Sequence, residues 1–287
     1  MNNKAVIFIA GQSNAHAHAQ KLPEEDWIRT PLGNVFSLDR EPNQAYDRDC
    51  VVWSGFTTAG KNLGETQDHT WSVANCLAKQ WQAEIDGGNP RNLPDLYIVQ
   101  IAIGAQGVSE NYMWYPEREK KLIPGPLGTA DISLFPFTME ILSLLDDSFR
   151  SMDMEYEILG LHWRGGEEET CCEAEDLEGL LTGIYRRILP AFSRVLNDPP
   201  ILLHWIIAAD RVMDLDPTGV KLQRMHTINR VFARMAEEME NVSIFDPRNA
   251  PQYTPDVRGT GVFIEDMVHF TPEVNRWVAS EILNGYR

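Results

Sequence analysis

Short apolar segments alternate with segments of helical periodicity along this chain, and this alternation limits its fold more than any other feature. The predicted strands comprise residues 4–10, 96–103, 156–163, 201–208 and 242–245. The predicted helices comprise residues 70–86, 137–149, 176–196, 219–240 and a last one that starts at Thr271-Pro272 and ends at Asn284-Gly285. Buried strands separated by helices are typical of a parallel sheet with helices on both faces. We therefore predict an α/β fold with a parallel sheet of about five strands.

A serine follows the first predicted strand directly. The apolar residues 6–10 end in Gly11-Gln12-Ser13-Asn14. Sites in open α/β sheets form at the carboxyl ends of the strands, where a hydrolase can present a serine hydroxyl. A hydroxyl is a weak nucleophile at neutral pH, so this interpretation requires a nearby base.

His269 is the strongest candidate for that base among the seven histidines. Asp266 lies three residues before it, and a carboxylate at this spacing can orient an imidazole on one loop. On these two residues alone, Asp266 would simply cap the turn and His269 would be an ordinary loop residue. The pairing with Ser13 favours the catalytic interpretation.

Two further motifs lie between the serine and the histidine. Ile-Gly-Ala occupies residues 103–105 after the second strand, and Trp-Arg-Gly-Gly-Glu occupies residues 163–167 after the third. With these four motifs in this order, the chain resembles the SGNH hydrolases, specifically the branch of sialate O-acetylesterases and acetylxylan esterases (carbohydrate esterase family 6-like). The resemblance implies a three-layer, flavodoxin-like fold. It also implies a cofactor-free Ser-His-Asp esterase that acts on acetylated sugars, with Gln12 and Glu167 beside the site.

The resemblance implies three donors to the oxyanion of an acyl-transfer intermediate. Two are the backbone N–H groups of Ser13 and Gly104, and the third is a glutamine side chain at position 165. This chain has Gly165 there. Arg164 or Gln106 could replace the missing donor, the site could work more slowly with two donors, or the reaction could be lost. Asn14 is either another donor or a residue that fixes the loop.

We predict one catalytic domain over residues 1–287, because the first and last motifs must share one site. Residues 20–68 and 109–136 are rich in proline, glycine, asparagine and charge and lack a clear period. Long loops of this kind tend to form functional walls or lids. Trp114 in the second stretch, with its neighbouring tyrosines, offers a flat face on which a sugar could stack. The alternative is that these rings pin the loop to the body of the protein.

Other polar clusters suggest competing sites. His16 and His18 have the spacing of a metal-binding pair, but no third ligand stands out, and we predict no metal site. His162 could reach the site or merely be packed. His69 beside Asp68 is a second candidate dyad, although its place before a predicted helix favours a capping and substrate-wall role.

The acidic run at residues 167–169 could suggest a glycosidase. That chemistry needs two carboxyl groups held apart across a cleft, and a contiguous run does not indicate this. We therefore expect the two carboxylates after Glu167 to be solvated or to cap a helix.

The net charge of −17 repels phosphate backbones and anionic membrane surfaces, so nucleic acid and membranes are not expected partners. The same field favours neutral acetylated sugars over strongly anionic substrates. The four cysteines show no metal spacing and are expected to be reduced. The sequence shows neither a clear signal peptide nor an apolar stretch of membrane-spanning length, which suggests a cytoplasmic protein or a secreted one with its signal removed.

Together these features predict a serine O-acetylesterase that acts on a small-molecule or oligosaccharide acetyl ester; its oligomeric state stays open. A second hypothesis is a catalytically weak or inactive relative that binds a glycan or protein in the same cleft. A third changes the acyl group, as in a thioesterase or lipid esterase, but the polar loops give no sign of an apolar tunnel.

Overall fold

The computed structural model describes residues 4–16, 24, 28, 30–40, 53–58, 71–118, 122–125, 128–131, 133–207, 216–255, 261–266 and 268–286. Its strands are β1 (Lys4–Gly11), β2 (Val35–Arg40), β3 (Trp53–Thr58), β4 (Asp95–Ala102), β5 (Leu122–Gly125), β6 (Gly128–Asp131), β7 (Tyr156–Arg164), β8 (Ile201–His204) and β9 (Val242–Phe245). Its helices are α1 (Ser13–His16), α3 (Val73–Asp86), α4 (Leu134–Ser151), η4 (Glu168–Cys171), α5 (Leu177–Leu196), α7 (Val220–Glu238), η5 (Pro247–Asn249) and α8 (Pro272–Gly285).

The described strands form one seven-stranded sheet in the order β3-β2-β4-β1-β7-β8-β9, with β5 and β6 as a separate hairpin. All neighbours in the large sheet are parallel except β3, which runs antiparallel to β2 at one edge. The predicted α/β class and parallel sheet are confirmed, with more strands than expected. Within the described ranges, none of the helices combines the length and apolar character needed to cross a bilayer.

The two additional strands lie inside the stretch predicted to be irregular, residues 20–68. Strand β2 extends the sheet beside β4, and Phe36 stacks on Tyr97 with ring centroids 4.7 Å apart. The hairpin of β5 and β6 likewise falls inside the stretch 109–136. These strands are only four to six residues long, so their apolar residues do not form a period that stands out in the sequence.

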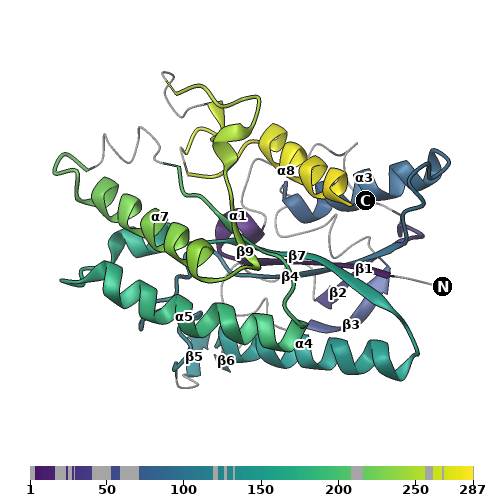
Figure 1. Cartoon of the computed structure of the whole chain (residues 1–287), viewed down its shortest axis with the longest axis horizontal. Coiled ribbons are helices and arrows are strands. Elements are labelled where there is room, and N and C mark those ends of the chain that lie inside the picture. The colour runs from purple at the N-terminus through teal and green to yellow at the C-terminus, as the bar shows by residue number, and fades with distance from the viewer. Residues whose placement is uncertain are drawn as a thin grey trace.

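The helices cover both faces of the sheet, with α3 and α8 on one side and α4, α5 and α7 on the other (Figure 1). Strand β1 is buried on both faces, since alternate residues contribute to the two hydrophobic clusters. The helix ends carry the expected signals. Ser72 and Asn75 form a capping box at the start of α3, and the Thr271 hydroxyl accepts a hydrogen bond from the amide of Val274 at the start of α8.

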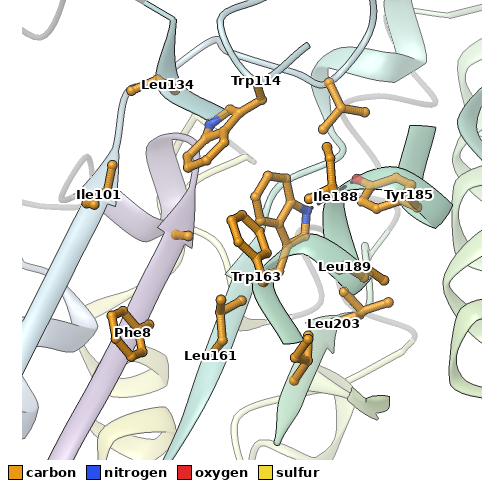
Figure 2. Packing of buried hydrophobic residues seen from close by; sticks show 14 of the residues in the cluster. Phe8, Ile101, Trp114, Leu134, Leu161, Trp163, Tyr185, Ile188, Leu189 and Leu203 are labelled. Carbon is orange, nitrogen blue, oxygen red and sulfur yellow. Dashed lines mark hydrogen bonds between the residues drawn. The ribbon is translucent and has the colours of Figure 1, made fainter. Parts of the chain in front are cut away.

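Trp114 lies in the hydrophobic core, and its ring offers no exposed face to a sugar. Its side chain is fully buried, its Nε1–H donates to the Gly11 carbonyl oxygen at 2.9 Å, and its ring meets Trp163 edge to face at 4.9 Å (Figure 2). This corrects the expectation that Trp114 contacts substrate and matches the loop-pinning alternative. Trp114 therefore fixes the loop after β4 against the end of β1.

Replacement of this ring should cost stability. We expect Trp114→Ala to lower the free energy of unfolding by about 3–5 kcal/mol, because it leaves a cavity and removes the partner of the Gly11 carbonyl. Urea denaturation followed by circular dichroism measures the loss. The exposed Leu144 on α4 provides a control, since Leu144→Ala should change stability by less than about 0.5 kcal/mol. Equal stability of the Trp114→Ala variant and the wild type would contradict the assignment of Trp114 to the core.

Candidate active site

The sheet register brings three of the four sequence motifs together. Gly11 at the end of β1 pairs with Ala102 at the end of β4 and with Arg164 at the end of β7. Ser13, Gly104 and Gly165 each follow these paired residues by one or two positions. The parallel arrangement therefore places the three motifs side by side at the carboxyl edge of the sheet, where sites in such folds form.

The turn that carries Ser13 packs closely on the end of β7. Gly11 has a φ of 132°, and a Cβ atom there would lie 2.2 Å from the Arg164 carbonyl oxygen. The amide of Gln12 donates to that same oxygen at 3.0 Å. Only glycine fits this approach, so the backbone fixes Ser13 as the first residue of α1, with 5% of its surface exposed.

Glu167 holds the residues on both sides of Ser13. Its Oε2 accepts a hydrogen bond from Gln12 Nε2 at 2.5 Å, and its Oε1 accepts one from Asn14 Nδ2 at 3.0 Å. Hydrogen bonds to an ionised carboxylate are stronger than bonds between neutral groups. Glu167 therefore links the third motif to the first and restricts the position of the serine between its two neighbours.

Asn14 extends this link to the histidine loop. Its Nδ2 donates to the Val268 carbonyl at 3.2 Å, and its Oδ1 accepts from the Phe270 amide at 3.1 Å. His269 lies between these two residues. The side chain next to Ser13 thus binds the backbone on both sides of His269, which brings the two ends of the chain to one site. Of the two roles weighed for Asn14, the observed contacts are those of a residue that fixes the loop.

Asp266 uses its two oxygens for two tasks. Oδ1 accepts from the amides of Val268 at 2.9 Å and His269 at 3.0 Å, which caps the turn, and Oδ2 bonds the His269 ring at Nδ1. Burial raises the pKa of Asp266, but the hydrogen bonds from the ring and the backbone outweigh it and bring the pKa to about 2. Because the ionised carboxylate can only accept, Nδ1 carries the proton and Nε2 is the ring atom left to act as a base. The capping and orienting roles, posed as alternatives from the sequence, coexist in one residue.

Arg164 is a support for the histidine loop. It is 2% exposed, its Nη1 donates to Asn275 Oδ1 on α8 at 3.4 Å, and its guanidinium lies 5.0 Å from the centroid of the Phe270 ring. Burial lowers its pKa to about 10. Its Nε and Nη2 groups are buried without a hydrogen-bond partner among the described residues, so the alternative that Arg164 supplies the missing donor stays a prediction.

Gln106 remains available for that role. Its Oε1 accepts from the Met113 amide at 3.1 Å, and among the described residues its side-chain nitrogen has no hydrogen-bond acceptor. It lies two residues after Gly104, the buried middle residue of the second motif, and directly after Ala105, whose φ is 52°. The loop that presents the Gly104 amide thus also offers a side-chain amide.

The two glutamates that follow the third motif, Glu168 and Glu169, are not fully exposed to solvent. Glu169 is fully buried, and its Oε1 accepts from the Val108 amide at 2.5 Å. A Cβ atom on Gly107 would lie 1.9 Å from the same oxygen, so only glycine allows this contact. Burial raises the pKa of Glu169 to about 7, although backbone hydrogen bonds from Val108 and Ser109 oppose the shift. The expectation for Glu169 is therefore wrong. Contact with a loop 61 positions earlier left no signal in the local sequence.

Glu168 is half-buried rather than solvated. Burial, followed by the charge of Glu167, raises its pKa. Its Oε2 accepts a hydrogen bond from the Tyr112 hydroxyl at 3.5 Å. The expectation of a solvated or capping residue thus fails here too, and both carboxylates after Glu167 contact the loop that follows the second motif.

Two of the remaining histidines, His162 and His204, lie against each other. His162 Nδ1 lies 2.9 Å from His204 Nε2, and both rings are buried. Burial, reinforced by the charge of Arg164, lowers the pKa of His162 to about 3 and that of His204 well below its ordinary value, so both are neutral. Of the two roles considered for His162, the structure shows a side chain that packs in the interior. His18, Asp68 and His69 lie outside the described residues.

A small cavity of about 200 Å³ opens beside the site. Its walls include Glu167 and Val268, which both bind Asn14, and the rings of Phe263, Phe270 and Trp205. Pockets that bind small molecules are mostly apolar with a few polar groups, and this cavity has that character.

Comparison with known proteins establishes the fold. No protein-family model matches the chain, and no curated protein matches it in sequence. NanS shares 17% identity over 99% of this chain and 97% of its own, with a TM-score of 0.59. A protein from Arabidopsis thaliana shares 14% identity over 99% of both chains, with a TM-score of 0.57. A carbohydrate acetylesterase from Xanthomonas citri shares 11% identity over 99% of this chain and 55% of its own, with a TM-score of 0.50. The predicted resemblance is confirmed at the level of the fold.

The buried Glu169 should make stability depend on pH. Its pKa of about 7 in the folded state exceeds the ordinary value of 4.5, so its contribution is complete below about pH 4.5 and is lost as the pH rises through 7. We expect the free energy of unfolding to fall by up to about 1.4 kcal/mol per pH unit in this window, and Glu169→Gln to flatten the slope.

Urea denaturation at pH 5, 6 and 7 tests this expectation. Glu173→Gln, an exposed change two residues past the end of η4, should retain the slope of the wild type. If Glu169→Gln kept the same slope as well, some other group would be responsible for it.

Proposed function

We propose that this protein is a serine esterase that removes acetyl groups from carbohydrate hydroxyls. The observation that supports it most is the link through Asn14, which binds the backbone on both sides of His269 while Ser13 lies next to it in sequence. The shared fold with a carbohydrate acetylesterase supports the same class of reaction. Acyl transfer of this kind requires at least a nucleophile and an oriented base close together, here at one edge of the sheet.

In the proposed reaction, Ser13 Oγ attacks the acetyl carbonyl while His269 Nε2 takes the hydroxyl proton. The ionised Asp266 stabilises the resulting imidazolium through Nδ1. The imidazolium then gives its proton to the departing sugar oxygen, which leaves an acetyl group on Ser13. Water repeats the sequence with His269 as base, which releases acetate and restores the serine. The backbone amides of Ser13 and Gly104 donate to the oxyanion in both halves. Neither half-reaction requires a cofactor.

A second candidate is a catalytically weak or inactive relative that binds a glycan or protein at the same edge of the sheet. The observation that favours it is Gly165 in place of the glutamine implied by the resemblance. The position has room for a side chain, since a Cβ atom would meet Gly11, Trp163 and Gln12 atoms at ordinary distances of 3.5 to 3.7 Å.

Substitutions of the proposed triad test the reaction. Ser13→Ala and His269→Ala should each lower kcat/KM for p-nitrophenyl acetate by about three orders of magnitude or more, because each removes a group that acts in the transition state. Asp266→Asn should cost less if other contacts retain the ring. Unfolding midpoints close to the wild-type value would show that the losses are chemical. Acetate release that persists in Ser13→Ala would exclude Ser13 as the nucleophile.

Restoring the amide at position 165 distinguishes the two candidates. We expect Gly165→Gln to raise kcat/KM by up to about 100-fold, since one oxyanion donor is typically worth that much or more. Gly165→Ala controls for the added Cβ and should show no such gain. An unchanged rate in the glutamine variant would indicate that another group, such as the amide of Gln106, already fills the position.

A further inference from the structure

A second, larger cavity shares the side chain of Trp205 with the small cavity beside the site. It has a volume of about 660 Å³, within the range of about 300–1,000 Å³ that is usual for ligand pockets. Its walls are Trp205, Gln223, His226, Thr227, Asn229 and Arg230. Trp205 is common to both cavities, so a ligand that extends away from the small one would meet this groove next.

Trp205 is held in place by contacts on its backbone and its ring. It directly follows β8, and its amide donates to the Phe245 carbonyl at 2.9 Å. The guanidinium of Arg248 lies 5.3 Å from its ring centroid, and Asp246 holds that guanidinium at Nε and Nη2. Among the described residues, the indole N–H has no hydrogen-bond acceptor. Trp205 is thus a fixed aromatic surface with a free donor.

The opposite wall is fixed to the same segment. Asn229 on α7 is buried, its Oδ1 accepts from the Ile206 amide at 3.0 Å, and its Nδ2 donates to the Ile206 carbonyl at 2.8 Å. Ile206 follows Trp205 directly. This pair of bonds sets the distance between the helix and the aromatic surface before any ligand binds, which reduces the entropy that binding costs.

The face of α7 turned toward the groove is polar. Gln223, His226, Thr227 and Arg230 have the spacing that aligns side chains on one side of a helix. Gln223 and His226 are exposed, and their side chains make no hydrogen bond to any residue that the structure describes. An amide and an imidazole can each both donate to and accept from hydroxyl groups.

The charge of the groove is balanced. Among the wall residues that the structure describes, Arg230 is the only permanently charged side chain, and its guanidinium pairs with Glu178 at 3.1 Å. A fixed aromatic face beside uncommitted polar groups and little net charge suits a neutral sugar, which has an apolar ring face and a rim of hydroxyls.

We propose that this groove binds a neutral oligosaccharide and extends the active site, so that the substrate is a chain of several sugars that bears an acetyl ester. The inference rests on the proposed esterase function for the position of the ester. Binding in the groove itself requires only Trp205 and the polar face of α7.

Kinetics with two substrates test the extension. We expect Trp205→Ala to lower the ratio of kcat/KM for acetylated xylotetraose to kcat/KM for p-nitrophenyl acetate by about 10-fold, equivalent to about 1.4 kcal/mol. Gln223→Ala should lower the same ratio by about 3-fold, and this exposed change guards against misfolding of the tryptophan variant. Glu237→Gln, exposed on α7 outside the groove, is the matched control and should leave the ratio unchanged.

Calorimetry without turnover tests binding separately. Ser13→Ala protein is titrated with unacetylated xylotetraose, cellotetraose and mannotetraose, with and without Trp205→Ala. If at least one of these oligosaccharides binds and Trp205→Ala abolishes its binding, the result supports oligosaccharide binding in the groove. This holds even if no ester is hydrolysed and the proposed function fails. The two proposals can fail separately. If hydrolysis of p-nitrophenyl acetate depends on Ser13 but neither groove variant changes the ratio of kcat/KM values, the proposed binding of oligosaccharides in the groove is wrong and the proposed esterase activity stands. Failure of all three oligosaccharides to bind would overturn the proposed binding as well.

Discussion

The two oxygens of Glu167 connect most of what surrounds the candidate site. One accepts a hydrogen bond from the residue before Ser13 and the other from the residue after it. Asn14, which Glu167 holds in this way, makes its other side-chain hydrogen bonds to the backbone on both sides of His269. A single carboxylate at the end of β7 therefore controls the geometry of the first motif directly and that of the last motif through one intermediate. Its loss would disturb both, although it belongs to neither.

This arrangement separates chemistry from support. Ser13, Asp266 and His269 are held by neighbours that hydrogen-bond within the protein, and buried groups such as Arg164 and Trp114 pack against the segments that carry them. Such support matters because acyl transfer tolerates little displacement of its reacting groups. The groove beyond Trp205 has the same arrangement, with Asn229 and Arg248 as supports and the exposed face of α7 as the surface that we propose binds a ligand.

Much of this could be predicted from the sequence where a signal is local. The five predicted strands and the cap at Thr271 depend on apolar runs and on one hydroxyl near one amide. Strand β2 and the burial of Glu169 depend on partners far along the chain, which periodicity does not reveal. Trp114 illustrates the limit most clearly. An aromatic residue in a polar loop suggests a binding surface, and only the packing against Trp163 shows that the loop folds inward.

The position of β1 has a consequence for how the protein is made. This strand precedes the other described strands in the sequence, yet its neighbours in the sheet are β4 and β7, and its last pairing partner in β7 is Arg164. Contacts between segments so distant in sequence form slowly and leave apolar strands exposed while they wait. The turn that carries Ser13 packs on the end of β7, so it cannot take its final shape until the segment around Arg164 has been synthesised. His269 is synthesised later still, so a chain that stopped after β7 would contain Ser13 without the histidine that we propose as its base.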